Sequence, residues 1–203
     1  MLIIGITGPS GAGKTSALRA IESLGARTLD CDKIYHQLLA DDRNLKLELD
    51  ARFPGVFKEG VIDRGALGEI VFNDDAALAD LNKIAHKYVD YAVMRSIDEW
   101  QDSGGAAAAV DAIALIESGL AQKCDVVVSI VAPIDARIQR IMTRDGITRE
   151  RAELRVNAQK PESFFRENSD IILENVYDTP GEFENECKAV FTKLIGGYLP
   201  DEC

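Results

Sequence analysis

The sequence lacks a long hydrophobic run, a signal peptide and any close pair of cysteines. Its longest apolar stretches, such as 106–110, are far shorter than the roughly 20 residues that a membrane-spanning helix needs. Met1 leads almost directly into an apolar run without a basic segment, so we expect a cytoplasmic protein with no membrane association. The scattered positions of the four cysteines predict reduced structural thiols rather than disulfides or a metal site. These cysteines are Cys31, Cys124, Cys187 and Cys203.

Basic residues are fewer than acidic ones, which gives the chain a formal net charge of −11. A nucleic-acid-binding protein needs a basic face, so we expect no nucleic-acid partner. The stretch 137–166 is an exception, with eight basic and four acidic residues. A local basic region in an acidic protein suits a compact polyanion such as a nucleotide, although a solvated helix of mixed charge explains it equally well.

Short, mainly apolar runs, of which 2–7 is rich in β-branched residues, alternate with segments of helical periodicity. The runs predict five strands, at 2–7, 27–29, 106–111, 125–131 and 170–173. Predicted helices lie at 14–24, 33–39, 133–144, 148–158 and from Pro180 onward, and 42–103 is mainly helical. This order predicts an α/β fold with a central, mostly parallel five-stranded sheet.

A glycine-rich loop follows the first strand directly. Gly8-x-x-x-x-Gly13-Lys14-Thr15 matches the complete phosphate-binding P-loop pattern between a strand and a helix. Its backbone N–H groups form an anion site, Lys14 is expected to reach the β and γ phosphates, and the Thr15 hydroxyl is the expected Mg²⁺ ligand. The residues predicted to bind the nucleotide here are Gly8, Gly11, Ala12, Gly13, Lys14, Thr15 and Ser16.

The P-loop alone leaves the reaction open among kinases, ATPases and GTPases. The sequence contains no convincing base-reading N-K-x-D motif or D-x-x-G switch of a GTPase, and motor ATPases are usually larger. A short chain with a basic segment and a helical insertion favours phosphoryl transfer to a small molecule.

Two aspartates, Asp30 and Asp32, follow the second strand, at the sheet edge where α/β proteins bind ligands. On an extended segment both side chains point to the same side, so Asp32 is a candidate to orient an acceptor hydroxyl. The alternative, equally supported by the residues, is that Asp32 only caps the helix that begins at Lys33.

Beyond the P-loop, the order of several short motifs resembles the dephospho-CoA kinase family along nearly the whole chain. These motifs are Leu29-Asp30-Cys31-Asp32, Ile62-Asp63-Arg64-Gly65-Ala66-Leu67, Leu81-Asn82-x-x-x-His86, Asp111-x-x-x-Leu115-x-Glu117, Gln139-Arg140-x-x-x-Arg144-Asp145, Arg155-x-x-x-Gln159 and Asp170-Ile171-Ile172-x-x-Asn175. The resemblance implies a P-loop kinase with three layers. It also implies ATP- and Mg²⁺-dependent phosphorylation of the ribose 3′-hydroxyl of dephospho-CoA, the last step of coenzyme A synthesis.

The resemblance also implies roles for individual residues. Asp32, Lys14 and Arg140 become the catalytic residues, Arg144 a phosphate contact, and Asn175 a neighbour of the adenine. Asp32, Arg64, Asn82 and His86 become acceptor-binding residues. The expected parts are a nucleotide-binding core (1–30, 105–144, 168–203), a helical acceptor-binding region (31–104) and a lid (145–167). Residue-level alternatives are that Asp63 caps a helix and that Asn82 and His86, four apart, bond to each other.

Arg140 and Arg144 are also four residues apart. This spacing stacks two like charges and therefore favours an anion between them.

Some positions depart from the family pattern and keep other acceptors open. Pro9-Ser10 is more similar to the loop of a uridine kinase, and His36, Lys87 and Ile113 replace the usual arginine and two prolines; Lys160-Pro161-Glu162 interrupts the usual end of the lid. A kinase for another small acceptor, such as a nucleoside, is therefore the first alternative. The second is a regulatory protein that binds a nucleotide without catalysis.

Overall fold

The structure, a computed structural model, describes residues 1–58 and 60–198, and the chain divides into two compact units. One unit comprises Met1–Leu29 and Trp100–Cys203, and the other comprises Asp30–Glu99. The boundaries lie close to those expected between core and acceptor region, but the functional division of the chain into core, acceptor region and lid stays a prediction. None of the described helices is both long and apolar enough to span a membrane.

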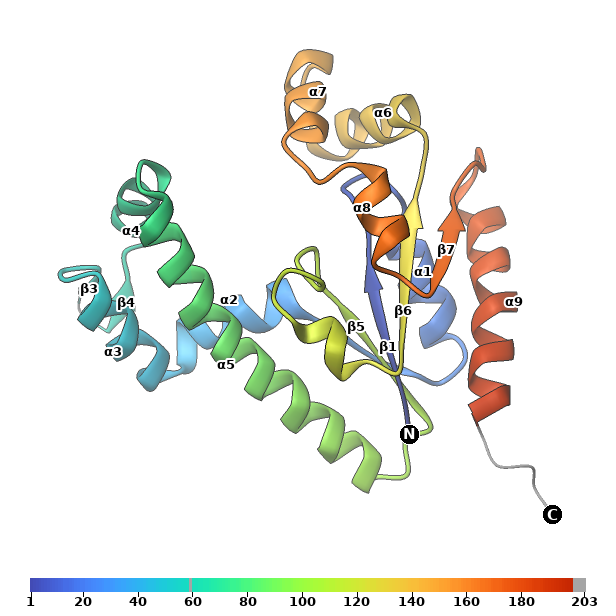
Figure 1. Ribbon diagram of the computed structural model, residues 1–203, viewed down its shortest axis with the longest axis horizontal. Helices are drawn as coiled ribbons and strands as arrows, with labels where there is room; N and C mark the ends of the chain where they lie inside the picture. The colour runs from blue at the N-terminus through green and yellow to red at the C-terminus, as the bar shows by residue number, and fades with distance from the viewer. Residues whose placement is uncertain (59, 199–203) are drawn as a thin grey trace. The chain divides into compact units, whose positions relative to one another are not determined.

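A five-stranded sheet forms the centre of the first unit, with the strand order β2-β5-β1-β6-β7 (Figure 1). Its strands are β1 (Leu2–Thr7), β2 (Arg27–Asp30), β5 (Ala107–Asp111), β6 (Val126–Val131) and β7 (Ile171–Glu174). Strand β1 pairs in parallel with β5 and β6, and β6 pairs in parallel with β7. The predicted α/β fold and all five predicted strands are confirmed, with bounds that differ by at most one residue.

Helices α1 (Lys14–Glu22) and α9 (Pro180–Tyr198) pack on this sheet and on each other. Their apolar residues repeat at helical spacing, so each helix directs one stripe into the core. Ala17 and Ile21 of α1 and Phe183 and Phe191 of α9 are fully buried. This packing fixes the first turn of α1, and therefore the loop before it, against the end of the sheet.

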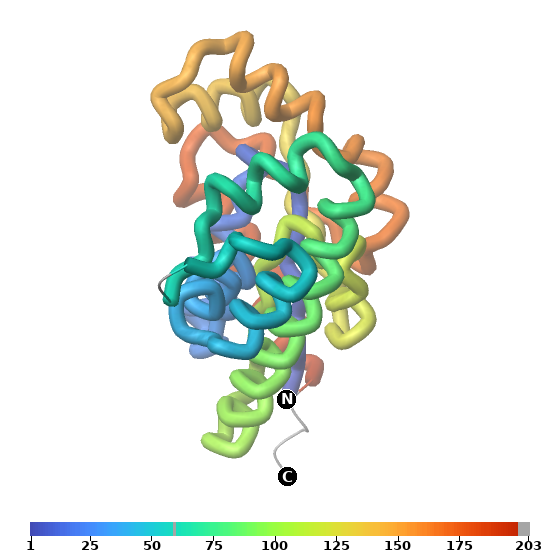
Figure 2. The backbone as a smooth tube through the Cα atoms, turned by 90° about the vertical axis from the view of Figure 1, so that its left-hand side faces the viewer, coloured from blue at the N-terminus to red at the C-terminus, as the bar shows by residue number. Residues whose placement is uncertain are grey.

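Two further helices, α6 (Ile134–Asp145) and α7 (Arg149–Asn157), form a hairpin that follows β6 (Figure 2). They share a small apolar cluster that includes Ile138 and Ile141 of α6 and Ala152 and Val156 of α7. Gly146 allows the turn between them because it adopts a left-handed conformation, with φ 63°. A short helix that the sequence did not predict, α8 (Glu162–Glu167), then leads to β7, and a 3-10 helix lies at Leu120–Lys123.

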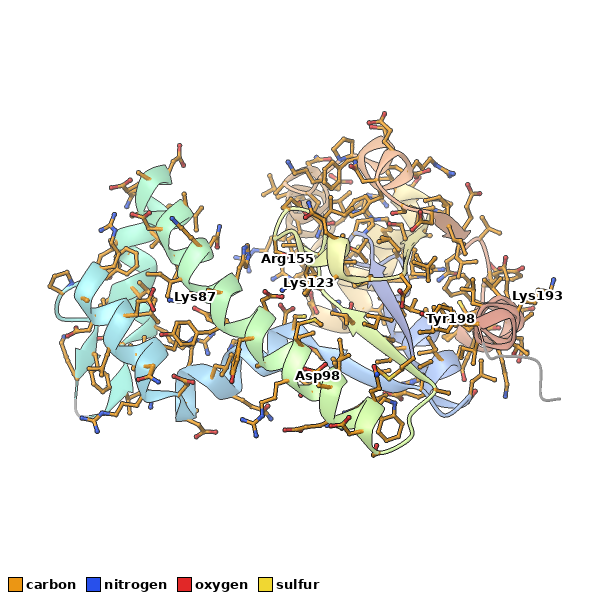
Figure 3. The ribbon with its side chains drawn as sticks, turned by 60° about the horizontal axis from the view of Figure 1, so that its bottom comes forward. Lys87, Asp98, Lys123, Arg155, Lys193 and Tyr198 are labelled. Carbon is orange, nitrogen blue, oxygen red and sulfur yellow. The ribbon has the colours of Figure 1, made fainter. Side chains whose placement is uncertain are left out.

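The second unit is mainly helical. It contains α2 (Cys31–Asp41), α3 (Arg43–Arg52), α4 (Arg64–Phe72), most of α5 (Asp75–Asp102), and a small antiparallel pair, β3 (Phe57–Lys58) and β4 (Val61–Ile62). Its own core contains Leu45, Leu49, Phe53 and Ile84. Lys87 on α5 (Figure 3) donates to Glu48 Oε1 on α3 at 2.6 Å, which ties these helices together.

The predicted reduced state is confirmed for three of the four cysteines, Cys31, Cys124 and Cys187, which form no disulfide. Cys203 lies outside the described residues. Burial raises the pKa of both Cys124 and Cys187 to about 12, so these thiols stay protonated and unreactive at neutral pH.

Candidate active site

The loop between β1 and α1 has the backbone geometry of a phosphate cradle. Gly8, Gly11 and Gly13 all have positive φ, of 136°, 78° and 112°. Gly13 is also the N-cap of α1, so the helix N-terminus begins where the loop ends. Residues that carry a side chain rarely adopt such φ values. Glycine at these positions therefore lets the backbone turn N–H groups toward an anion.

The loop also lies too close to its neighbours for side chains at these positions. A Cβ atom on Gly8 would lie 2.1 Å from the carbonyl oxygen of Ile130 on β6. A Cβ atom on Gly13 would lie 2.2 Å from Asn175 Nδ2. The surrounding strands therefore hold the backbone of the loop in place from outside.

Lys14, Thr15 and Ser16 form the first turn of α1. Lys14 Nζ donates to the carbonyl oxygen of Gly8 at 2.9 Å, so the side chain lies back across the loop. Thr15 is exposed and Ser16 is buried. The Lys14 ammonium therefore lies at the loop, and the exposed Thr15 is accessible to a ligand bound there.

Side chains from outside the loop hold its carbonyl groups. Arg137 Nε donates to Ser10 O at 3.1 Å, and Arg140 Nη1 donates to Gly11 O and Ala12 O at 3.2 and 3.3 Å. Ala12 O also accepts from Asn175 Nδ2 at 2.8 Å. Three consecutive carbonyls are therefore engaged by donors around the loop. The N–H groups of Ser10 and Ala12 are engaged as well, since they donate to Gln159 Oε1 at 3.1 Å and to Pro9 O at 3.2 Å.

Arg140 and Asn175 are also bonded to each other. Arg140 Nη2 donates to Asn175 Oδ1 at 3.2 Å and to Tyr177 O at 3.1 Å. Burial lowers the pKa of Arg140, although the guanidinium remains charged at neutral pH. The structure thus brings the predicted Arg140 and Asn175 together with Gly11, Ala12 and Gly13. Their expected roles at the phosphates and the adenine stay predictions.

Asp111 is a candidate metal-binding residue that was not predicted from the sequence. Asp111 ends β5 and lies in register with Ile6 of β1, the strand that leads into the P-loop. An apolar strand that ends in aspartate beside the P-loop strand is the arrangement in which P-loop enzymes hold Mg²⁺. The run of alanines and Val110 before Asp111 is the sequence signal that could have identified it.

The metal would have few protein ligands in this arrangement. Within residues 1–58 and 60–198, no group of three or more His, Cys, Asp or Glu side chains could hold a metal ion. Mg²⁺ commonly needs only one or two protein ligands when phosphates and water complete its shell. Thr15 and Asp111 therefore fit Mg²⁺ better than they fit a transition metal.

Arg144, predicted to contact phosphate, is exposed and bonded to Asp145 instead. Its Nε and Nη2 atoms donate to the two carboxylate oxygens of Asp145 at 2.7 and 3.0 Å. Arg155 of α7 donates to the same carboxylate. Hydrogen bonding from Arg144 lowers the pKa of Asp145, so this carboxylate is ionised and holds the two arginines together.

The second unit contains the aspartate pair, and the expected geometry of that pair is wrong. Asp30, rather than Asp32, is the N-cap of α2: its Oδ1 accepts from Lys33 N at 3.0 Å. Burial favours a higher pKa for Asp30, but the hydrogen bonds from Lys33 outweigh it and hold the pKa below its ordinary value. Asp32 is exposed in the first turn of the helix, because α2 begins at Cys31. The two side chains therefore do not alternate along an extended segment, and the capping alternative for Asp32 is wrong too.

The other predicted acceptor residues lie on separate helices of the same unit. Arg64 begins α4, after Asp63, which is confirmed as the cap of that helix because it accepts from Ala66 N at 3.0 Å. Asn82 and His86 lie on α5; Asn82 is exposed and His86 is half-buried. Burial raises the pKa of Tyr35 on α2, and the positive charge of Arg64 offsets only part of this increase.

Comparisons with known proteins identify the family to which this chain is similar. The sequence profile of the dephospho-CoA kinase family matches residues 2–180. A dephospho-CoA kinase of Geobacter sulfurreducens is 33% identical over 196 residues, which cover 95% of this chain and 98% of the relative. The crystal structure of a Thermus thermophilus protein covers 95% of this chain and 97% of its own, with 30% identity and a TM-score of 0.77. A dephospho-CoA kinase structure from Campylobacter jejuni covers 97% and 98%, with 25% identity and a TM-score of 0.70.

Proposed function

The chain belongs to the dephospho-CoA kinase family, and from its geometry we propose how it carries out the ATP-dependent phosphorylation of dephospho-CoA. The observation that carries the proposal is the braced P-loop, in which three consecutive carbonyls, from Ser10 to Ala12, accept hydrogen bonds from outside. A loop held in this way is organised for a triphosphate before the ligand arrives. The proposal extends to the ribose 3′-hydroxyl as the acceptor atom and to the cytoplasm as the location.

ATP binds with its β and γ phosphates in the cradle. Lys14 leaves the Gly8 carbonyl, to which it is bonded at 2.9 Å, and places its ammonium against the phosphates. The exchange replaces a neutral acceptor with an anionic one, which strengthens the hydrogen bond. Lys14 therefore stabilises the negative charge that develops during transfer.

Thr15 and Asp111 are the residues that would hold Mg²⁺. Thr15 offers an exposed hydroxyl at the start of α1, and Asp111 offers a carboxylate at the end of the neighbouring strand β5. Bound Mg²⁺ neutralises phosphate charge and orients the γ-phosphoryl group. An oxygen-rich, two-residue set suits this hard cation.

Asp32 orients the acceptor hydroxyl and accepts its proton. Its carboxylate is exposed in the first turn of α2 and is not committed to the cap, because Asp30 performs that role. The oxygen of the 3′-hydroxyl attacks the γ-phosphorus, the bond to the β–γ bridging oxygen breaks, and ADP leaves. By its position in the motif Leu29-Asp30-Cys31-Asp32, Asp32 corresponds to the aspartate that accepts the hydroxyl proton in other kinases.

Apart from Asp32, the acceptor region supplies binding rather than chemistry. Arg64, Asn82 and His86 lie within the unit Asp30–Glu99, and we assign them to the phosphates and base of dephospho-CoA. Arg144 is assigned to the ATP phosphates. To reach them, its guanidinium must release the carboxylate of Asp145 and bind a phosphate oxygen instead. Such chemistry depends mainly on positioning and charge neutralisation.

An acceptor panel tests the proposal directly. ADP release is measured with ATP, Mg²⁺ and either dephospho-CoA, uridine or no acceptor, and the phosphorylated position is identified by ³¹P NMR. We expect turnover only with dephospho-CoA, at the 3′-oxygen. Turnover with uridine but not with dephospho-CoA would establish the nucleoside alternative, and ATP binding without any turnover would establish the regulatory one.

A further inference from the structure

Ser10, in the second variable position of the P-loop, is held by both of its backbone groups. Its carbonyl accepts from Arg137 Nε at 3.1 Å, and its N–H donates to Gln159 Oε1 at 3.1 Å. Arg137 Nη2 also donates to Gln159 Oε1, at 2.7 Å, which closes the arrangement. These three residues therefore form one connected network, which we call the Ser10 clamp.

The Ser10 clamp joins two segments that are distant in sequence. Arg137 lies on α6, and its backbone also packs against the loop, because a Cβ on Gly11 would lie 2.7 Å from the Arg137 carbonyl oxygen. Gln159 lies two residues after the end of α7, the helix that packs on α6. A displacement of the segment that follows α7, within the predicted lid, therefore acts directly on the position of Ser10.

The charge of Arg137 is the second observation. This side chain is only 5% exposed, and its Nε and Nη2 atoms both donate to uncharged acceptors. Burial lowers its pKa, and the charge of Glu162 compensates for only part of this effect. A buried cation with uncharged acceptors is costly unless an anion lies nearby, and the phosphates of a bound nucleotide would supply one beside the same loop.

We propose that Arg137 and Gln159 are positioning residues for the nucleotide phosphates. Through Ser10 they fix the P-loop and couple its position to the lid segment that follows α7. The inference rests on the proposed function only in taking ATP as the ligand. Arg137 acts through the loop backbone, so its loss weakens ATP binding without changing the affinity for the acceptor. Gln159 acts on the same residue, Ser10. The losses of ATP affinity caused by removing Arg137 and by removing Gln159 are therefore not additive.

The test compares Arg137→Met and Gln159→Leu, singly and together, with Arg137→Lys as a rescue variant. ATP affinity is measured by calorimetry without acceptor, and KM is measured separately for ATP and for dephospho-CoA. Arg137→Met should raise the Kd and KM for ATP about tenfold or more, as expected for lost hydrogen bonds to a charged group, while KM for dephospho-CoA stays constant. Arg137→Lys should recover part of the loss, and the double variant should be no worse than Arg137→Met.

Arg149→Met is the matched control, because Arg149 is an exposed lid arginine that pairs with Asp135 and Glu153 rather than with the loop. It should retain wild-type affinity for ATP. Unchanged ATP affinity in Arg137→Met and Gln159→Leu, or equal rises in KM for both substrates, would overturn the proposal in favour of a structural role. If Arg137→Met does not fold, Gln159→Leu and Arg137→Lys decide by the same criteria. Wild-type turnover with dephospho-CoA tests the proposed function separately, because the calorimetry needs no turnover.

Discussion

Gly13→Ala should strongly destabilise the unit that contains the P-loop. Two costs apply at this position. Gly13 has φ 112°, a conformation that costs an L-residue about 1–2 kcal/mol. The new Cβ would also lie 2.2 Å from Asn175 Nδ2, which donates to Ala12 O at 2.8 Å. Because Asn175 is only 4% exposed, it cannot move away without losing this buried hydrogen bond.

The magnitude follows from these two terms. Loss of a buried hydrogen bond that leaves its partner unsatisfied costs about 1–3 kcal/mol, so the total is about 2–5 kcal/mol. A protein of this size loses about 2–4 °C in Tm for each kcal/mol, which predicts a decrease of about 4–20 °C. Gly25→Ala isolates the first term, because Gly25 has φ 84° and nothing lies within 4 Å of its Cβ position. That control should cost about 1–2 kcal/mol.

Urea unfolding followed by tryptophan fluorescence measures both changes. The chain has a single tryptophan, and Trp100 lies in the same unit as the P-loop, where its Nε1 donates to Ala107 O at 2.9 Å. A double-mutant cycle with Asn175→Ala should show positive coupling of about 1–3 kcal/mol, because the clash requires both side chains. Equal destabilisation by Gly13→Ala and Gly25→Ala, together with additivity in the cycle, would refute the reasoning.

Three further predictions concern the chemistry and the second unit. Asp32→Asn should lower kcat about 10²- to 10⁴-fold while the Kd for ATP is unchanged, and a wild-type kcat would remove Asp32 from the proton transfer. Asp111→Asn should raise the Mg²⁺ concentration needed for half-maximal activity about tenfold, as measured by Mg²⁺ titration at saturating ATP, and an unchanged midpoint would exclude Asp111 as a ligand. Burial and the hydrogen bond to Glu48 raise the pKa of Tyr88 to about 12, so its stabilising effect is complete below pH 10 and is lost as pH rises to 12. Urea unfolding between pH 9 and 12 should therefore show a smaller alkaline loss of stability in Tyr88→Phe than in the wild type, and equal losses would contradict the assignment.

The sequence predicted those features whose signals are local. Strands such as 2–7 and 126–131 could be located because each is a short run rich in β-branched residues. The P-loop could be identified because the spacing of Gly8, Gly13 and Lys14 is itself the requirement for the backbone turn and the phosphate contact. Helix α8 was missed because six residues after Pro161 give too little periodicity to distinguish a helix from a loop.

The bracing of the loop could not be predicted because its partners are far apart in the sequence. Arg137 and Ser10 are separated by 127 positions, and no local pattern indicates that an arginine on a helix will donate to a loop carbonyl. The predicted geometry of Asp30 and Asp32 was wrong for a different reason. Both aspartates are acceptable caps, and the choice depends on whether the helix begins at Cys31 or Lys33, a boundary that propensity does not resolve to two residues.

The two arginines of α6 illustrate how a correct observation on the sequence can have another explanation. The spacing of Arg140 and Arg144 in the sequence favours an anion between them, since like charges four residues apart on a helix repel. In the structure the side chains diverge: Arg140 donates to Gly11 O and Ala12 O, and Arg144 donates to Asp145. The repulsion is therefore relieved without a phosphate, and the spacing no longer supports a shared anion. The predicted contact of Arg144 with phosphate therefore requires its release from Asp145, whereas the predicted role of Arg140 requires no such release, because Arg140 already bonds to the loop.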